Sequence, residues 1–270
     1  MALLARRWPR VDPRPDEPLS GWARRLDPEA ATGLALSVAL VLLVGGGLVL
    51  VVLAFLLRAD PDAIGLDAAA AKWGDAHATP FTNDVLGAIT NIGQPRSVVI
   101  MAAVLAVVET IRTRNLWIAP FFVLVVAGNG LATTTIKHVA DRVRPSFNPD
   151  AAALGPSFPS GHSSWTAAFF AAAALVLASE ATRRQRVVLA GLAAGMAAAI
   201  ASSRVLLDVH WVSDVVAGVV LGWAWFAACA IAFGGRLVRF GATAEAALDE
   251  DGDDGPRTSR AGKRQDALVR

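Results

Sequence analysis

Residues 137–145 read KHVADRVRP, residues 159–162 read PSGH and residues 203–214 read SRVLLDVHWVSD. Long apolar runs separate these three polar clusters and continue on both sides of them. Polar clusters that interrupt long apolar runs fall at helix ends, where several helices can bring them together. The stretch from Lys137 to Asp214 therefore predicts a bundle of apolar helices whose polar clusters converge on one face of a membrane.

The composition also indicates a membrane protein. Of the 270 residues, 54% are hydrophobic and 18% are charged, and the mean hydropathy is +0.48. A soluble domain is rarely so apolar. The formal net charge of +2 does not indicate a nucleic-acid partner. The single cysteine, Cys229, excludes an intramolecular disulfide and is expected to be a small buried hydrophobic residue.

Six apolar runs predict an all-α fold, a bundle of six transmembrane helices over residues 31–233. The runs are Ala31–Leu57, Val98–Thr110, Leu116–Ile136, Trp165–Leu177, Val187–Ser202 and Val215–Phe233. The second and fourth are shorter than the roughly 20 residues needed to cross a bilayer, so they must borrow flanking residues. Asp60–Gln94 is expected to be a loop with a short helix along the membrane surface near Leu66–Trp73.

Two polar tails flank the predicted bundle. Residues 1–30 are rich in Arg and Pro and are expected to be a disordered basic N-terminus in the cytoplasm. A targeting sequence is the alternative, but the apolar run that follows is longer than a signal-peptide core, which favours a retained helix. Residues 241–270 are expected to be a disordered cytoplasmic tail, because their acidic run lacks the ligand spacing of a calcium loop.

The distribution of basic residues predicts the orientation in the membrane. With six spans, one side of the membrane receives most of the arginines that flank the spans: Arg6, Arg7, Arg10, Arg14, Arg24, Arg25, Arg112, Arg114, Arg183, Arg184, Arg186, Arg236 and Arg239. By the positive-inside rule this side is the cytoplasm, which holds both termini, and the polar clusters face the other side. Lys137, Arg142 and Arg144 run against the rule there, which suggests that they bind something anionic.

Small and polar residues within the spans predict helix contacts. Gly191-x-x-x-Gly195 and Gly218-x-x-x-Gly222 permit two helices to approach closely, and Asn129 and Thr133–Thr135 are expected to bond to neighbouring helices. Three tryptophans at the ends of apolar runs are expected to be interfacial anchors: Trp117, Trp165 and Trp211.

Each polar cluster has a chemical interpretation and a plainer one. Lys137 and Arg144 suit a phosphate group, although basic residues at a helix end also serve as snorkelling anchors or lipid-headgroup contacts. Ser160 is a candidate helix N-cap, Gly161 lets a ligand approach the backbone, and His162 can donate a proton. The plainer interpretation of this second cluster is a capped helix start with an interfacial histidine.

The third cluster places His210 and Asp214 four residues apart, hence on one face of a helix. A carboxylate bonded to one ring nitrogen fixes the tautomer and raises the basicity of the other nitrogen. His210 is therefore a candidate nucleophile, with Arg204 near enough to neutralise phosphate charge. The alternative is a structural His–Asp pair at a helix N-terminus.

Taken in order, Lys-x6-Arg-Pro, Pro-Ser-Gly-His and Ser-Arg-x5-His-x3-Asp resemble the tripartite signature of the type 2 phosphatidic acid phosphatase superfamily, which shares its site with vanadium haloperoxidases. The motifs cover residues 137–214, and the six-span layout extends the resemblance to residues 31–233. A haloperoxidase is not expected, because those relatives are generally soluble.

The resemblance implies a role for each matching residue. His210 would attack phosphorus to form a phosphohistidine, Asp214 would orient it, and His162 would protonate the leaving group. The phosphate-binding residues would be Lys137, Arg144, Arg204, Ser160 and Gly161. No metal and no cofactor is implied. His77 and His138 match no defining position, although His138 is close enough to the site to modulate it. Asp141, Arg142 and Asp208 occupy variable positions within the motifs, from which they could contact a lipid headgroup.

These features predict an integral phosphatase of the plasma membrane, with its active site on the extracytoplasmic face. A lipid phosphate or diphosphate is the expected partner, with polyprenyl diphosphate favoured over phosphatidic acid and phosphatidylglycerophosphate. A lipid phosphotransferase and a non-enzymatic transporter of anionic lipids are the alternatives. The absence of a clear internal repeat speaks against the transporter. The sequence leaves open the lipid, the choice between hydrolysis and transfer, the role of the tails and the oligomeric state.

Overall fold

The computed structural model describes residues 28–60, 64–146, 154–179 and 181–237, and the regular structure in these ranges is entirely helical. Apart from residues 28–30, which begin the first helix, the two expected tails lie outside the described residues. In chain order the helices are α1 (Pro28–Ala59), α2 (Gly65–Ala76), α3 (Pro80–Ile92), α4 (Pro95–Thr113), α5 (Ile118–Val123), the π-helix η2 (Leu124–Gly128), α6 (Asn129–Ala140), α7 (Gly161–Leu177), α8 (Arg183–Leu206) and α9 (Val212–Leu237).

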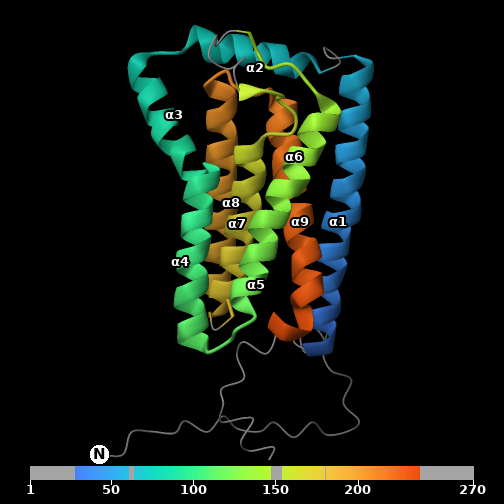
Figure 1. The fold of residues 1–270 in the computed structure, drawn as a ribbon, viewed down its shortest axis with the longest axis vertical. Coiled ribbons are helices and arrows are strands. Elements are labelled where there is room, and N and C mark those ends of the chain that lie inside the picture. The colour runs from blue at the N-terminus through green and yellow to red at the C-terminus, as the bar shows by residue number, and fades with distance from the viewer. Residues whose placement is uncertain (1–27, 61–63, 147–153, 180, 238–270) are drawn as a thin grey trace, which may run out of the picture.

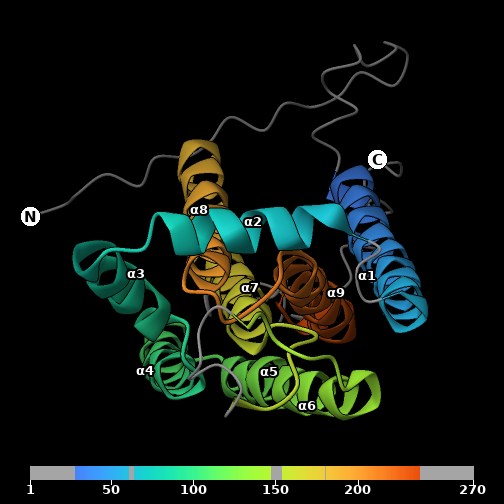
Figure 2. The ribbon, with the colours of Figure 1, turned by 90° about the horizontal axis from the view of Figure 1, so that it is seen from above.

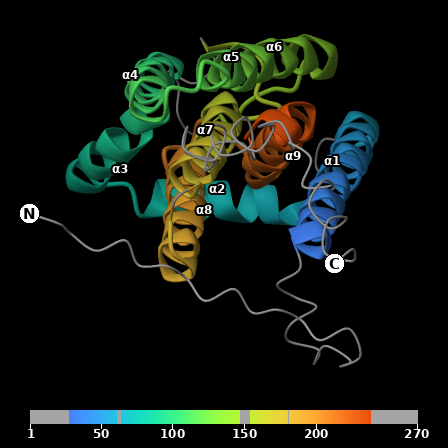
Figure 3. The same ribbon diagram turned by 90° about the horizontal axis from the view of Figure 1, so that it is seen from below.

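Most of these helices stand side by side in one bundle, and α2 lies across one end of it (Figure 1). Viewed from that end, α2 passes over α8 and α9, which it contacts (Figure 2). Viewed from the opposite end, α7 and α9 lie in the middle of the bundle, between α5–α6 on one side and α2 on the other (Figure 3). The first residues of α1 and the last of α9 lie at the end opposite α2 (Figure 1).

Four of the described helices are long and apolar enough to cross a membrane: residues 37–59 of α1, the continuous segment α5–η2–α6, α8, and residues 212–233 of α9. The count rises to five if α3 and α4, bent by 44° at Gly93 and Gln94, form one span. α7 has 17 residues and is a shorter apolar helix. The helical fold class is therefore confirmed, and the described residues contain four or five candidate spans by length and composition, not the six expected.

The prediction for Asp60–Gln94 was only partly right. The expected surface helix is present as α2, but residues 80–92 form α3 instead of a loop. Thr79 starts α3 through a capping box with Thr82, and Pro80 occupies the first turn, where its missing N–H is not needed. These start signals were readable in the sequence. α3 extends the short run at Val98–Thr110 toward the length of a full span.

The largest apolar cluster fills the half of the bundle away from α2, and two smaller ones lie nearer to α2. Phe121, Phe122 and Phe169 form edge-to-face and tilted ring contacts in the largest cluster, and Val98 and Cys229 are buried beside them. This confirms the expectation for Cys229. On the outside, large apolar side chains such as Phe55 and Ile111 are exposed, as suits helices surrounded by lipid.

The contact between α7 and α9 is close because two glycines of α9 face the backbone of α7. A Cβ on Gly218 would lie 2.5 Å from the carbonyl oxygen of Ser160, and one on Gly222 would clash with the carbonyl oxygen of Ser164. We call these four residues the α7–α9 seam. The prediction of close approach is confirmed here.

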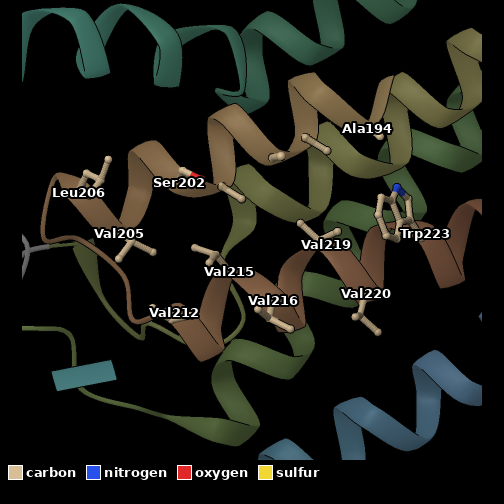
Figure 4. Close-up of a pocket in the computed structure, with 13 residues that line it drawn as sticks. Ala194, Ser202, Val205, Leu206, Val212, Val215, Val216, Val219, Val220 and Trp223 are labelled. Atoms are coloured by element: carbon tan, nitrogen blue, oxygen red, sulfur yellow. The ribbon is translucent and has the colours of Figure 1, made fainter. Parts of the chain in front are cut away.

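The other glycine pair has no such contact. Gly191 and Gly195 of α8 have no neighbouring atom within 4 Å of a Cβ added to them, so the same spacing does not mark a helix contact there. α8 and α9 diverge on the side away from α7 and leave a groove of about 620 Å³ between them (Figure 4). Small and apolar side chains line it, among them Ala201, Val205 and Val219.

The helix α5–η2–α6 contains one wide π-helical turn before Asn129. Beyond this turn, Asn129 and Thr133 face α7, where Ser164 donates to Oδ1 of Asn129 over 3.0 Å and lies 3.3 Å from the hydroxyl of Thr133. The expected bonds to neighbouring helices are confirmed for these two residues. Thr135 instead donates to the carbonyl oxygen of Leu131 in its own helix.

Candidate active site

The three polar clusters lie together at the end of the bundle that α2 covers. Lys137 is in the last turn of α6, His162 in the first turn of α7, and Arg204 in the last turn of α8. Arg144 belongs to the connection between α6 and α7, and Asp214 to the first turn of α9. The predicted convergence of the clusters is confirmed, and it is produced by the antiparallel course of neighbouring helices (Figure 1).

His210 lies in the five-residue loop between α8 and α9 and is 2% exposed. Its Nδ1 is 3.3 Å from Oδ2 of Asp214, which also accepts a bond from the backbone N–H of Trp211. Its Nε2 is 3.2 Å from Nη1 of Arg144. Because a guanidinium nitrogen can only donate, Nε2 is the acceptor and the ring proton is on Nδ1. His210 thus holds the tautomer in which the lone pair of Nε2 faces the cationic cluster.

Burial lowers the pKa of His210 to about 4. The hydrogen bond and charge of Asp214 oppose this shift, and the positive charges of Arg144 and Lys137 add to it. The ring is therefore neutral at physiological pH, with its lone pair free to act as a nucleophile or base.

Arg144 and Lys137 are held by backbone carbonyls of the segments before α7 and α9. Arg144 donates to the carbonyl oxygens of Gly155, Pro156 and Val209, and Lys137 donates to those of Pro156 and Ser157. Arg144 is 8% exposed. These neutral acceptors position the two cations, and the Asp214 carboxylate acts electrostatically on both without bonding to either.

Ser160 occupies the N-cap position of α7, as expected, but makes no side-chain capping bond. Its hydroxyl accepts from Ser163, and its N–H donates to the carbonyl oxygen of Asp214. Gly161 has open space on its Cβ side, where the nearest atom is a methyl group of Thr133 at 3.9 Å. The start of α7 is thus fixed to the start of α9, and its first residue, Gly161, presents bare backbone.

Arg204 is buried and donates to the hydroxyl of Thr90 in α3 over 3.1 Å. Its Nε atom is also buried and has no hydrogen-bond partner among the described residues. His162 is partly exposed and interacts electrostatically with Arg204, His210, Arg144 and Lys137. All of the residues matched to the signature therefore belong to one cluster.

Some polar residues lie elsewhere than expected. Arg142 does not reach outward to a headgroup; it points inward and bonds to Asp214, Ser213 and Asp67. Asp208 is also buried, below Gly74 of α2, and burial raises its pKa to about 6. Asp141 is exposed at the end of α6.

Of the tryptophans expected to be interfacial anchors, one lies inside the bundle and two are at least partly exposed. Trp165 packs against Gly130 inside the bundle instead of anchoring at the surface, whereas Trp117 is 47% exposed. Trp211 is partly exposed and donates to the carbonyl oxygen of Val143.

Sequence reasoning missed Asp67 and Thr90, which reach the site from α2 and α3. Asp67 is the only acidic residue in the first turn of α2, and Thr90 is one of several hydroxyl residues in α3, so neither stood out. No three His, Cys, Asp or Glu side chains in the described part of the chain lie close enough together to hold a metal ion.

Comparisons with known proteins agree with this site. The PAP2 superfamily matches residues 118–237, which include every residue of the cluster from Lys137 to Asp214. The chain is 30% identical over 148 residues to phosphatidylglycerophosphatase B of Bacillus subtilis, covering 53% of this chain and 71% of that protein. It is 35% identical over 120 residues to lipid A 1-phosphatase of Rhizobium etli, covering 41% of this chain and 47% of that one.

A solved structure shares the fold. The transmembrane PAP2-type phosphatidylglycerolphosphate phosphatase from Bacillus subtilis superposes with a TM-score of 0.67 and 24% identity, over 74% of this chain and 99% of the other. Fold and relatives together define a membrane-embedded phosphatase of lipid phosphate esters. The chain belongs to the PAP2 superfamily.

Proposed function

We propose that this protein hydrolyses the phosphate ester or diphosphate of a membrane lipid through a phosphohistidine on His210, without a metal. The observation that carries the proposal is the setting of the His210 ring. Its Nδ1 is bonded to Asp214 and its Nε2 faces Arg144, at the meeting point of three further charged or titratable side chains.

In the first step, Nε2 of His210 attacks phosphorus and the bond from phosphorus to the lipid oxygen breaks. Asp214 stabilises the positive charge that develops on the ring. His162 gives its proton to the leaving oxygen. In the second step, water attacks the phosphohistidine, the nitrogen–phosphorus bond breaks, and inorganic phosphate leaves while His162 recovers a proton.

The phosphoryl oxygens are held by Lys137, Arg144 and Arg204, with the hydroxyl of Ser160 and the backbone N–H of Gly161. The buried Nε of Arg204 supports this assignment, because a buried donor without a partner is rare unless a ligand completes it. The open Cβ side of Gly161 gives an oxyanion access to the start of α7. Donors fixed before the substrate arrives stabilise a transition state most effectively.

His162 can act as an acid only when the substrate is bound. Lys137, Arg144 and Arg204 act on it electrostatically and disfavour a further positive charge. A phosphate anion placed among these cations offsets their charge, and protonation of His162 then becomes favourable. The proton is thus available when there is a leaving group to receive it.

For the membrane arrangement, we propose six crossings: α1, α3–α4, α5–η2–α6, α7, α8 and α9. α7 runs beside full spans, which supports its crossing although it is short (Figure 1). Arg112, Arg114 and the arginines that begin α8 lie at the end away from the site, which supports a cytoplasmic location for that end and for both termini. The site then faces the outside of the plasma membrane.

A cysteine at exposed Ser146 should react with an impermeant thiol reagent added to intact cells, and protection there would overturn this orientation.

The substrate class rests on the relatives. Their names point to phosphatidylglycerophosphate and to a lipid A phosphate, whereas the resemblance at the sequence level favoured polyprenyl diphosphate. We place phosphatidylglycerophosphate first, because the relative of that name is matched over most of its length. Phosphatidic acid is a further candidate.

The test offers these lipids to the purified protein in detergent and measures release of inorganic phosphate. His210→Ala should abolish release, and His77→Ala, at the exposed C-terminal end of α2, should retain it. A chelator should leave release unchanged.

No release from any lipid, or equal release by His210→Ala, would overturn the enzymatic proposal and leave the anion-binding transporter. Loss of activity in chelator would remove the metal-free mechanism. Appearance of the phosphate on an added lipid alcohol, rather than as inorganic phosphate, would show transfer instead of hydrolysis.

A further inference from the structure

The carboxylate of Asp214 is held from both sides, and only one side involves His210. Oδ2 accepts from Nδ1 of His210 and from the backbone N–H of Trp211. Oδ1 accepts from Nη1 of Arg142 over 2.7 Å. Asp214 itself is fully buried. Its rotation about the side-chain bonds is therefore set by Arg142 as much as by the histidine it orients.

Arg142 is held in turn by Ser213, a variable position of the third motif, and by Asp67, which lies outside all three motifs. Nη1 also donates to the hydroxyl of Ser213 over 2.7 Å, and Nη2 donates to Oδ2 of Asp67 over 2.9 Å. The side chains of Arg142 and Asp67 are 8% and 5% exposed. The guanidinium lies 5.5 Å from the ring centre of Trp211, the residue that follows His210. Two of these partners adjoin the nucleophile directly: Asp214 bonds to His210, and Trp211 follows it in the chain.

Asp67 joins the surface helix α2 to the start of α9. Besides Arg142, it accepts bonds from the backbone N–H and the hydroxyl of Ser213. It thus takes the place of an N-cap for α9, although it lies 146 residues away in the chain. The three charges alternate in sign: Asp67 negative, Arg142 positive and Asp214 negative.

We propose that Arg142 and Asp67 are positioning residues for the nucleophile, acting on His210 through Asp214. The proposal rests on the role assigned to His210 above. Arg142 keeps Asp214 ionised and aims Oδ2 at the ring. Asp67 holds the guanidinium and offsets its charge, so that Asp214 retains the negative potential that stabilises the ring as it becomes positive. In this role, neither Arg142 nor Asp67 needs to touch the substrate.

A purely structural role for the Asp67–Arg142 ion pair predicts something different. Fastening α2 to α9 would make the pair matter for stability but not for the basicity of His210. Substituting either residue would then lower the unfolding temperature and leave the pH dependence of the surviving enzyme unchanged.

The positioning role predicts pH shifts of opposite sign for the two residues. Removing the positive charge of Arg142 raises the proton affinity of the His210–Asp214 pair, so the acid limb of kcat/KM moves to higher pH. Removing the negative charge of Asp67 lowers that affinity, so the limb moves to lower pH. The other groups that face His210 are the same in both variants: Asp214 from α9, Arg144 from the connection before α7, Lys137 from α6, His162 from α7 and Arg204 from α8.

The test compares Arg142→Met, Asp67→Asn and their double variant with the wild type, using whichever lipid of the panel above it hydrolyses fastest. Each single variant should lose about 10- to 100-fold in kcat with little change in KM, by analogy with the loss on removing the outer partner of a metal-ligating histidine. The double variant should be no worse than Arg142→Met, because coupled residues are not additive. Asp75→Asn, an exposed position of α2, should behave as wild type.

Inhibition by inorganic phosphate checks that each variant keeps a folded site. If Arg142→Met fails to fold, Arg142→Lys replaces it; one ammonium cannot reach both carboxylates, so kcat should fall while the acid limb stays near its wild-type position. Unchanged kcat, unshifted acid limbs or a change confined to KM in folded variants would overturn the proposal. Those results, with an active wild type and an inactive His210→Ala, would leave the proposed function intact. An inactive wild type would instead contradict the proposed function itself.

Discussion

The two sides of α9 differ in how they meet their neighbours. On one side, Gly218 and Gly222 touch the backbone of α7, and Asp214 continues the same line at the site end. On the other side, Val216 is 45% exposed beside the groove that separates α9 from α8 (Figure 4). One side is a close-packed contact with the buried carboxylate of Asp214 at its end, and the other is an open apolar surface.

This difference shows what the glycine spacing does. Asp214, Gly218 and Gly222 follow at intervals of four residues, so they lie on one face of the helix. Ser160 and Ser164 do the same on α7. The α7–α9 seam therefore fixes the position of the second motif along the bundle axis relative to the third. As a result, the N–H of Ser160 bonds to the carbonyl of Asp214. Gly191 and Gly195 have the same spacing but make no close helix contact, so they do not fix the position of a neighbouring helix.

The largest effect should come from Asp214 on the packed side. Asp214→Asn keeps the shape of the side chain but removes its charge and favours the wrong ring tautomer of His210. We expect kcat to fall by roughly 1,000-fold or more, as for the equivalent change in a serine protease triad. Steady-state phosphate release measures it. A loss below about tenfold would contradict the role of Asp214 in orienting the nucleophile.

The seam itself should be the next most sensitive feature. Gly222→Ala places a methyl group against the carbonyl of Ser164, and Gly218→Ala places one against Ser160. Overpacking of this kind destabilises by about 1–3 kcal/mol. Thermal unfolding in detergent should show it, and Gly218→Ala, being nearer the site, should lower kcat more than Gly222→Ala. Equal stability of both variants and the wild type would mean that the helices can separate freely.

A smaller effect concerns pH. Because burial holds the pKa of His210 near 4, the ring loses its lone pair only in acid. Activity limited by His210 should therefore persist from pH 7 to about pH 5 and disappear as pH falls toward 4. The pH profile of kcat/KM measures this, with the substrate's own phosphate ionisation, near pH 6, determined separately. An acid limb near 6.5, the ordinary value for histidine, would show that the loop carrying His210 opens to water.

The open side of the bundle should give the smallest effects. Gly195→Ala meets no atom within 4 Å, and Ala is the better helix former by about 1 kcal/mol. We expect unchanged activity and an unfolding temperature equal to or slightly above that of the wild type. Val216→Ala should also be nearly neutral. Marked loss in either variant would show that α8 and α9 close together in the membrane, and the contrast between the two sides of α9 would disappear.

The sequence predicted what depends on long apolar runs and on matched motifs. It identified the helical bundle, the convergence of Lys137, His162 and His210, and the hydrogen bonds of Asn129 and Thr133, because spacing along a helix determines which side chains share a face. It did not identify α3, although Thr79 and Pro80 signal its start, because a stretch of mixed charge between two apolar runs predicts a loop.

Other parts of the site depend on contacts that no local pattern encodes. Asp67 matters only because α2 crosses the end of α9, and Thr90 only because α3 packs on the end of α8. Arg142 was noticed for breaking the charge rule, but its inward direction follows from partners supplied by α2 and α9. Two glycine pairs with identical spacing behaved differently because only one faces a neighbouring backbone.

The wide turn η2 has a consequence for how this chain compares with its relatives. Each residue turns an α-helix by about 100°, so one extra residue in a turn rotates everything after it by that amount. Without it, Asn129, Thr133 and Lys137 would swing together away from α7 while α5 kept its place in the core. A sequence aligned with this one that shows a single-residue gap between Trp117 and Asn129 should therefore lack the lysine cation at its site, or should have drawn its cation from another helix.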